Sequence, residues 1–214
     1  MLFRRISLLA ILITAAAIGF SAQDSSSTSQ KHVKKPAAPA RKALDPGSMS
    51  GNVYRNKTLG LSYKIPEGWV LRTDEMNEHE EETAPGSPVA QVLLAAFSRP
   101  PAARGEDVNS SVLIAAESQA SYPGLKEAVQ YLGPLGEVAK AQGFTEDDEP
   151  SELEVDGKTL IRANYHKNVG TRVMHQSTLA LLSHGYAISI TVIGGTDDEV
   201  DELIENLSFT AAAK

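Results

Sequence analysis

The apolar residues between Gly51 and Phe209 fall into short stretches, several of which alternate with polar residues in the period of two that is typical of strands. Val53 to Arg55 predicts a first strand. Leu61 to Ile65 alternates apolar and polar residues and predicts a second, half-buried strand, which follows a tight reversal at Gly60.

Two almost wholly apolar stretches come next, Val89 to Phe97 and Val112 to Ala116. Continuous apolar runs of this length are typical of strands buried on both faces. Because both faces of such a sheet must be covered, we expect helices on each side of it.

Acidic residues crowd into residues 74–82, between the first strand pair and these apolar runs. This charge run predicts a solvated loop or a frayed helix. Calcium binding is the alternative, although the acids lack the spacing and the turn glycine of an EF-hand loop.

The second half of the chain predicts an antiparallel meander. Leu153 and Val155 alternate with glutamates, and Asp156-Gly157 is a strong hairpin signal. The expected elements that follow are a return strand from Thr159 to His166, a loop from Lys167 to Gly170, a strand from Thr171 to Ser183, a turn at His184-Gly185 and a strand from Tyr186 to Ile193.

Helical periodicity appears in two places. Before the meander, the sequence predicts a helix that Gly133-Pro134 breaks or kinks, followed by a second short helix. After the meander, Thr196 and Glu199 form a capping-box pattern that opens an amphipathic helix. The apolar positions of the helices are Leu125, Ala128, Val129 and Leu132, then Leu135, Val138 and Ala139, and finally Val200, Leu203, Ile204 and Leu207. The predicted fold class is therefore α+β, an antiparallel sheet meander flanked by helices in an α/β/α sandwich.

The amino terminus has the three-part layout of a secretory signal peptide, with Arg4 and Arg5 before an uncharged apolar stretch. An uncleaved membrane anchor is the alternative. We predict a signal peptide over residues 1–22, a disordered linker rich in Ser, Pro, Ala and Lys over residues 23–50, a folded domain over residues 51–210 and a frayed tail over residues 211–214. The localisation that this predicts is periplasmic or secreted, with membrane contact only through the signal or anchor segment.

Charge and cysteine content narrow the classes of function. From Gly51 onward the chain carries 13 basic and 25 acidic residues, a balance of 13 − 25 = −12. An acidic domain repels phosphate backbones, so nucleic-acid binding is not expected. The chain has no cysteine, which excludes a thiol nucleophile, a lipid-modified cysteine and disulfide support.

Motifs for catalysis, cofactors or metals are not found. The sequence contains no Gly-x-Ser-x-Gly elbow, no Walker loop and no dinucleotide-binding glycine pattern. Gly194-Gly195 precedes a helix start, but the acids of that first turn repel an anion. We therefore predict no catalytic residue, no cofactor and no metal site, and a chain that is not an enzyme.

A polar cluster on the meander is the best candidate for a binding face. If residues 167–170 form a four-residue loop, His175 lies opposite Arg162, and one sheet face carries four polar side chains. A solvated or helix-rimmed sheet face, with the arginine as a carboxylate partner, is the alternative. A zinc site needs a further ligand that the pattern does not supply. The candidate binding face consists of Arg162, Asn164, His166 and His175.

The stretches Leu59-Gly60-Leu61-Ser62-Tyr63 and Ile65-Pro66-Glu67-Gly68-Trp69 resemble the start of PsbP-like domains, and the order of elements extends this resemblance to Phe209. The superfamily includes the photosystem II subunit PsbP, a nuclear Ran-binding import factor and bacterial envelope proteins of the DcrB type. The resemblance implies an antiparallel sheet flanked by helices, in a family whose members mostly bind partners. It brings no catalytic residue set.

These observations lead to three hypotheses on function. The first is an exported, non-enzymatic domain that binds a protein or an envelope component through an exposed sheet edge or the acidic loops. The second is a periplasmic carrier of a small ligand or metal ion, which uses a cleft between the sheet and the kinked helix near Arg162 and His175. The third is a hydrolase with a dispersed site. The sequence leaves the partner and the oligomeric state open.

Overall fold

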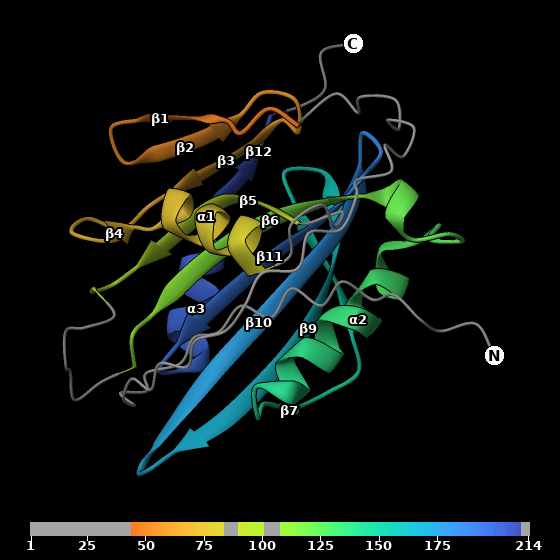
Figure 1. The fold of residues 1–214 in the computed structure, drawn as a ribbon. Helices are drawn as coiled ribbons and strands as arrows, with labels where there is room; N and C mark the ends of the chain where they lie inside the picture. The colour runs from red at the N-terminus through yellow and green to blue at the C-terminus, as the bar shows by residue number, and fades with distance from the viewer. Residues whose placement is uncertain (1–43, 84–89, 101–107, 211–214) are drawn as a thin grey trace, which may run out of the picture.

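A computed structural model describes residues 44–83, 90–100 and 108–210 of the chain (Figure 1). The predicted signal peptide, the linker as far as residue 43 and the frayed tail lie outside the described residues. The predicted linker boundary at residue 50 is wrong, because Leu44 is buried and Ser48–Ser50 form a strand. Residues 44–50 therefore belong to the folded domain. Among the residues described, no helix combines the length and apolar character needed to cross a membrane.

The large sheet is antiparallel throughout and carries the predicted meander. The strand order is β4 (Val70–Leu71), β5 (Gln91–Phe97), β6 (Ser111–Ser118), β11 (Tyr186–Gly194), β10 (Arg172–Ser183), β9 (Lys158–Val169) and β7 (Thr145–Glu146). A further strand, β8 (Ser151–Val155), also pairs with β9.

A second, small sheet covers part of one face of the large sheet, together with helix α3 (Asp197–Ile204). Its strand order is β1 (Ser48–Ser50), β2 (Val53–Asn56), β3 (Leu61–Lys64) and β12 (Leu207–Phe209). The main core lies between these layers and includes Tyr63, Ile190 and Leu203. Trp69 is partly buried and packs against this core with its large aromatic ring.

Two helices lie on the opposite face of the large sheet. Figure 1 shows α1 (Thr73–Thr83) and α2 (Ala128–Ala141) in front of that sheet and α3 behind it. α1 packs on β5, whereas α2 packs on β9 and β10 around Tyr131 and Tyr165. A short 3-10 helix, η1 (Gln119–Ser121), follows β6 in the connection that leads to α2. The layers are therefore helices, large sheet, and small sheet with α3, which confirms the predicted α+β class.

Several local predictions are confirmed. The hairpin signal Asp156-Gly157 joins β8 to β9, and both residues have the positive φ of a type I′ turn, 48° and 73°. The turn at His184-Gly185 likewise has positive φ at both residues, 54° and 80°. β5 and β6 are almost wholly buried, as continuous apolar runs predict. The acidic stretch forms helix α1.

The predicted break at Gly133-Pro134 is wrong, because α2 runs as one helix through Pro134. Gly133 lacks a Cβ and so tolerates the helical conformation before a proline better than other residues do. The first predicted helix face is also only partly right. Leu125 lies before the helix start, and Val129 is 45% exposed. The buried positions are Tyr131, Leu132, Gly136 and Ala139, a face shifted toward the second half of the helix.

Candidate functional site

The four residues of the predicted binding face lie on the same face of the sheet, as predicted, but the predicted pairing of β9 with β10 is wrong. The connection between β9 and β10 is shorter than the predicted loop, since Val169 already pairs with Arg172. His175 therefore lies opposite His166, and Arg162 lies opposite Leu179. This register differs from the prediction by an even number of residues. All four predicted side chains consequently share one face, the face that α3 partly covers.

Contacts within the protein engage each of these four side chains. Arg162 forms an ion pair of 2.7 Å with Asp201 of α3, and its Nε donates to Asn164 Oδ1 at 2.8 Å. His175 Nδ1 lies 2.8 Å from Asp197 Oδ1, at the start of α3.

His166 pairs in the same way with Asp147, which follows β7. These contacts are those of a helix-rimmed sheet face. Side chains of the sheet pair there with acidic residues of α3 and with Asp147 in the loop after β7. Ligand binding by this face remains a prediction.

The cleft expected between the sheet and the kinked helix does not lie near Arg162 and His175. α2 packs on the other face of the large sheet, beside Ala163 and Tyr165. Among the residues described, no group of three or more His, Asp or Glu side chains is arranged to hold a metal ion.

A cleft of about 470 Å³ opens where the small and large sheets part, and we call it the edge cleft. Its two sides are the β1–β2 hairpin and the β4–α1 segment, and residues 92–94 of β5 form its base. Met49 of β1 and Leu71 of β4 line it and are 42% and 46% exposed. The lining residues are Pro46, Gly47, Ser48, Met49, Tyr54, Leu71, Arg72, Thr73, Asp74, Glu75, Asn77, Val92, Leu93 and Leu94.

Polar contacts fix both sides of the edge cleft. Tyr54 Oη donates to the carbonyl of Pro46 at 2.9 Å, which holds the chain that enters β1. Burial raises the pKa of Tyr54 to about 12. On the opposite side, Arg72 and Glu75 form an ion pair of 2.5 Å. This hydrogen-bonded pair lowers the pKa of the Glu75 carboxyl and raises that of the Arg72 guanidinium.

α1 satisfies the outer edge of β5 beyond the short strand β4. Asn77 Nδ2 donates to the carbonyl of Val92 at 2.9 Å, and Asn77 Oδ1 accepts from the Val92 amide at 3.0 Å. Thr73 Oγ1 accepts from the Ala95 amide at 3.0 Å. Side chains of the helix thus stand where a longer strand would pair, so this part of the large-sheet edge is closed to another strand.

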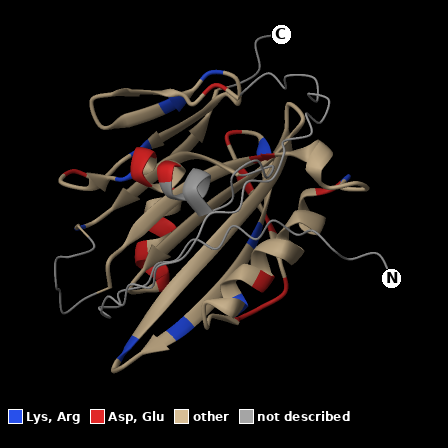
Figure 2. Ribbon diagram, viewed as in Figure 1, with Lys and Arg blue, Asp and Glu red and all other residues tan. Residues whose placement is uncertain are grey.

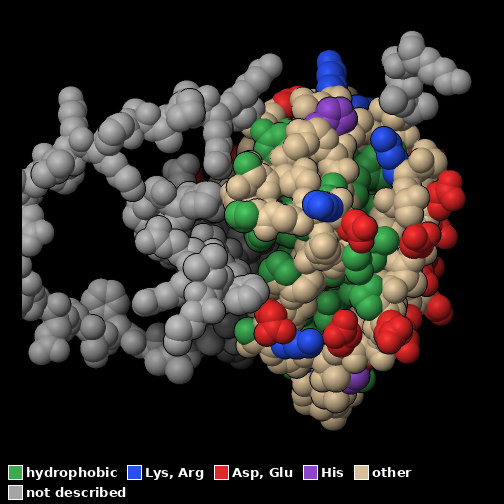
Figure 3. Space-filling view, turned by 90° about the vertical axis from the view of Figure 1, so that its right-hand side faces the viewer, with side chains coloured by type: hydrophobic (Ala, Val, Ile, Leu, Met, Phe, Trp, Pro, Cys, Tyr) green, Lys and Arg blue, Asp and Glu red, His purple; other side chains and the backbone are tan. Residues whose placement is uncertain are grey.

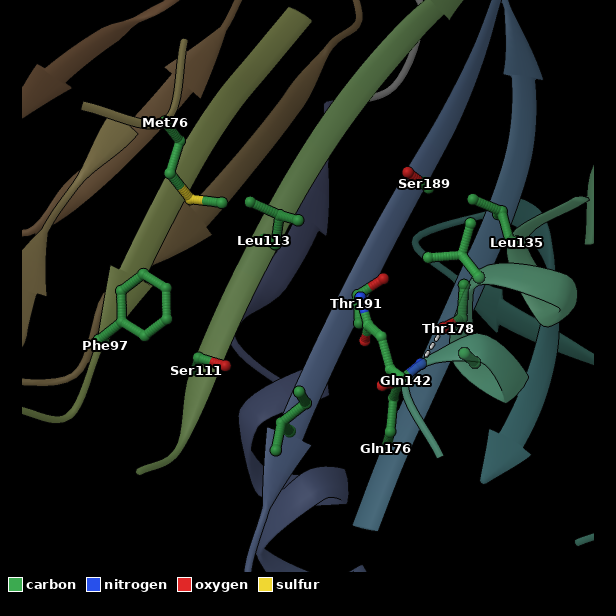
Figure 4. A pocket seen from close by; sticks show the side chains of 13 residues that line it. Met76, Phe97, Ser111, Leu113, Leu135, Gln142, Gln176, Thr178, Ser189 and Thr191 are labelled. Atoms are coloured by element: carbon green, nitrogen blue, oxygen red, sulfur yellow. Dashed lines mark hydrogen bonds between the residues drawn. The ribbon is translucent and has the colours of Figure 1, made fainter. Parts of the chain in front are cut away.

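A smaller pocket lies on the helical face of the large sheet, between α1 and α2 (Figure 4). Met76 and Phe97 stand on one side of it and Leu135 on the other, above polar sheet residues that include Gln176 and Thr178. Gln176 Nε2 donates to Thr178 Oγ1 at 3.1 Å. The pocket volume is about 60 Å³, far below the about 300 Å³ at which drug-sized ligand sites begin.

A buried carboxylate also lies beneath α2, where the sequence analysis had not singled it out. Glu117 is 6% exposed and accepts from the hydroxyls of Tyr122 and Tyr131, the second at 2.7 Å. Burial, reinforced by this acid, raises the pKa of both tyrosines. An acid that directly follows the apolar run, still within β6, is the sequence signal that could have pointed to this contact. Every polar atom of the group has a partner, so its role is to dock α2 on the sheet.

Charge is unevenly distributed over the elements that surround these features. Acidic residues gather on α1 and α3 (Figure 2). Acidic side chains also line one side of the face shown in Figure 3, with hydrophobic side chains exposed beside them. The edge cleft therefore has an acidic helix as one of its sides.

The sequence matches no protein-family model, and no curated protein sequence matches it. Solved structures with a similar arrangement include cyanobacterial PsbP from Synechocystis sp. PCC 6803, at 17% identity and a TM-score of 0.48, over 77% of this chain and 98% of that chain. LpqN of Mycobacterium tuberculosis, described as involved in cell envelope biogenesis, is similar at 14% identity and a TM-score of 0.38, over 78% and 87% of the two chains.

The Ran-binding protein Mog1p of Saccharomyces cerevisiae is similar at 10% identity and a TM-score of 0.41, over 76% of this chain and 96% of that chain. One of these similar structures is a PsbP, and the motifs around Tyr63 and Trp69 resemble the start of PsbP-like domains. Likenesses this distant carry no argument about activity or partners.

Proposed function

We propose that this chain is an exported, non-enzymatic domain that binds a protein partner through the edge cleft. The observation that carries the proposal is the exposure of Met49 and Leu71 on opposite sides of one cleft. Export rests on the amino-terminal sequence, with its two arginines and uncharged apolar stretch.

The edge cleft has the physical character of a protein-binding site. Exposed large apolar side chains are common singly, but a group of them around a concavity is typical of an interaction surface. Met49 and Leu71 are two of the five exposed large apolar side chains among the residues described, and they come from different sheets. A partner side chain inserted between them would remove both from water and contact the buried core residues Leu93 and Leu94.

The test is a crosslinked pull-down from the native cell envelope with the full chain as bait. We expect to capture one partner protein. Its binding should saturate, and an excess of untagged chain should displace it. The L71D variant should lose it, because a carboxylate in place of the apolar Leu71 side chain would be desolvated on binding. V129D on α2 is the matched control, since Val129 is 45% exposed and lies outside the edge cleft. Equal capture by both variants would contradict the proposal.

A small-ligand carrier is the second candidate, and the volume of the edge cleft favours it. The 470 Å³ falls within the range of about 300–1,000 Å³ that is usual for small-molecule sites. A ligand that binds the folded state must raise its thermal stability. A thermal-shift panel of metals and small envelope molecules, run on the full chain and on L71D, checks this. A shift confined to the unaltered chain would favour the carrier, and no shift with any compound would remove it.

A further inference from the structure

Resting on the proposed partner binding, we propose that the occupant of the edge cleft is an extended, basic segment of the partner protein, which adds a strand to the small sheet beside β1. The proposal commits to the mode of binding and to the charge of the segment. It is carried by the open edge of β1, the direction of the side chains along it and the acidic helix across the cleft.

β1 is the outer strand of the small sheet. Within the described part of the chain it pairs only with β2, through Ser48 with Arg55, Met49 with Tyr54 and Ser50 with Val53. In an antiparallel pair, backbone groups point alternately toward the partner strand and away from it. The outward groups of β1 therefore form an edge on which another strand can pair. All three side chains of β1 are exposed, so no described element covers it.

The large sheet offers no comparable edge at this cleft. β4 has only two residues, and beyond it Asn77 and Thr73 already bond to the backbone of β5. An extended segment entering the edge cleft thus meets one open strand edge, that of the small sheet. Strand addition of this kind takes its affinity from main-chain hydrogen bonds and its specificity from pockets for alternate side chains.

The side chains of an added strand would alternate between the cleft and the outside. Met49 lies opposite Tyr54, so the two share a face of the small sheet, and both line the edge cleft. Neighbours of Met49 on an added strand would point the same way, toward Leu71 on the other side of the cleft. The paired length is set by β1, three residues or about 10 Å at strand rise. Apolar residues at alternate positions of the partner segment fit this geometry.

The charge of α1 favours a basic segment. The sequence of this helix, Thr73–Thr83, carries six acids and no Lys or Arg. Asp74 and Glu75 line the cleft together with one basic residue, Arg72, which pairs with Glu75, so the lining carries one acid more than it has basic residues. Opposite charges on the partner would speed association and select against acidic segments.

A display selection tests the proposal, with a random library of short peptides as the probe and the full chain as the target. We expect enriched peptides that alternate apolar residues with others and carry Lys or Arg. Their affinity should fall about tenfold or more on L71D and on M49D, stay unchanged on V129D and weaken as salt rises.

Methylation of single backbone amides in a selected peptide separates strand addition from side-chain docking alone. Methyl groups on every second amide should weaken binding about tenfold, because those amides donate to β1, and methyl groups on the remaining amides should have little effect. Insensitivity at every position would overturn strand addition. It would leave the proposed function intact if the pull-down partner still depends on Leu71.

The selection and two further measurements distinguish other occupants of the edge cleft. Enrichment of acidic peptides, or of none, would overturn the proposed chemistry. If a synthetic peptide of residues 30–43 displaced the selected peptides and bound as tightly as they do, the site would belong to the chain's own basic linker. A dimer in sedimentation that M49D dissociates would assign it to a second copy. The proposed function itself fails only if the partner captured in the pull-down binds L71D as well as it binds the unaltered chain.

Discussion

Glu117 shows how one buried residue positions a whole helix. It lies near the end of β6 and accepts hydrogen bonds from Tyr122, just before α2, and Tyr131, within α2. Replacing it with leucine keeps a side chain of similar size but leaves the hydroxyls of the buried Tyr131 and the half-buried Tyr122 without their acceptor. We expect E117L to lower the free energy of unfolding by about 2–4 kcal/mol, because each unsatisfied buried group costs about 1–3 kcal/mol. Urea denaturation measures this loss.

Two further variants show whether the loss at this residue comes from the hydrogen bonds. Y131F removes one donor and leaves the acid in place, so it should cost about 1 kcal/mol. E152L on β8 is the matched surface change, since Glu152 is exposed, and it should stay within about 0.5 kcal/mol of the unaltered chain. If E117L and E152L behaved alike, the contact between β6 and α2 would carry no stability.

At the scale of the element, Pro134 weakens α2 without breaking it. The proline lies inside the helix and cannot donate to the carbonyl four residues earlier, that of Gln130. P134A restores this donor and removes the ring. We expect the free energy of unfolding to rise by about 1–2 kcal/mol, since the helical gain of about 3 kcal/mol is offset by the freer unfolded chain and by lost ring contacts.

Thermal and urea unfolding of P134A measure this gain, and circular dichroism checks that helix content is kept. G133A is a companion variant, because Gly133 is exposed and has open space around the position of a Cβ. Its gain in helix propensity of up to about 1 kcal/mol should appear in the P134A background, whereas beside Pro134 the added Cβ disfavours the helical conformation and offsets that gain. Destabilisation by P134A would mean that the contacts of the proline ring outweigh the missing hydrogen bond.

The strands show what a sequence can and cannot determine at this scale. Asp156-Gly157 has a turn chemistry that fixes the register of β8 on β9, and that prediction is confirmed. The connection around Gly170 contains no such pair. Alternation there determined which side chains share a face but not which residues lie opposite each other, and His175 therefore pairs with His166 instead of the predicted Arg162.

At the scale of the whole molecule, the edge cleft is the feature that the sequence could not reveal. Met49 and Leu71 lie in separate short strands of different sheets, and neither strand is long enough to show a period. Their proximity depends on how two layers stack and where they part. The layers themselves were predictable, because continuous apolar runs in β5 and β6 require cover on both faces. On one face the cover is partly a second sheet. The sequence did not reveal this sheet, because it forms through pairs of residues far apart in the chain, such as Phe209 with Leu61.

The tyrosines couple the stability of the whole molecule to alkaline pH. Burial raises the pKa of Tyr54 and Tyr165 to about 12, and it also raises the pKa of three further tyrosines. The further tyrosines are Tyr63, Tyr122 and Tyr131. In the unfolded chain a tyrosine ionises near pH 10. Above that pH the folded state binds more protons than the unfolded state, so the free energy of unfolding falls as pH rises.

We therefore expect stability that is fully present below about pH 10 and then lost by about 1.4 kcal/mol per pH unit for each of these tyrosines. Denaturant titrations at a series of alkaline pH values give this slope, and tyrosinate absorbance should appear together with unfolding. Y63F removes one titrating hydroxyl. It also removes the 2.9 Å hydrogen bond that Tyr63 donates to the carbonyl of Leu203. Its stability should be lower at neutral pH but fall less steeply above pH 10. If the stability of Y63F and of the unaltered chain fell equally steeply with pH, the ionisation of Tyr63 would not contribute to the loss of stability.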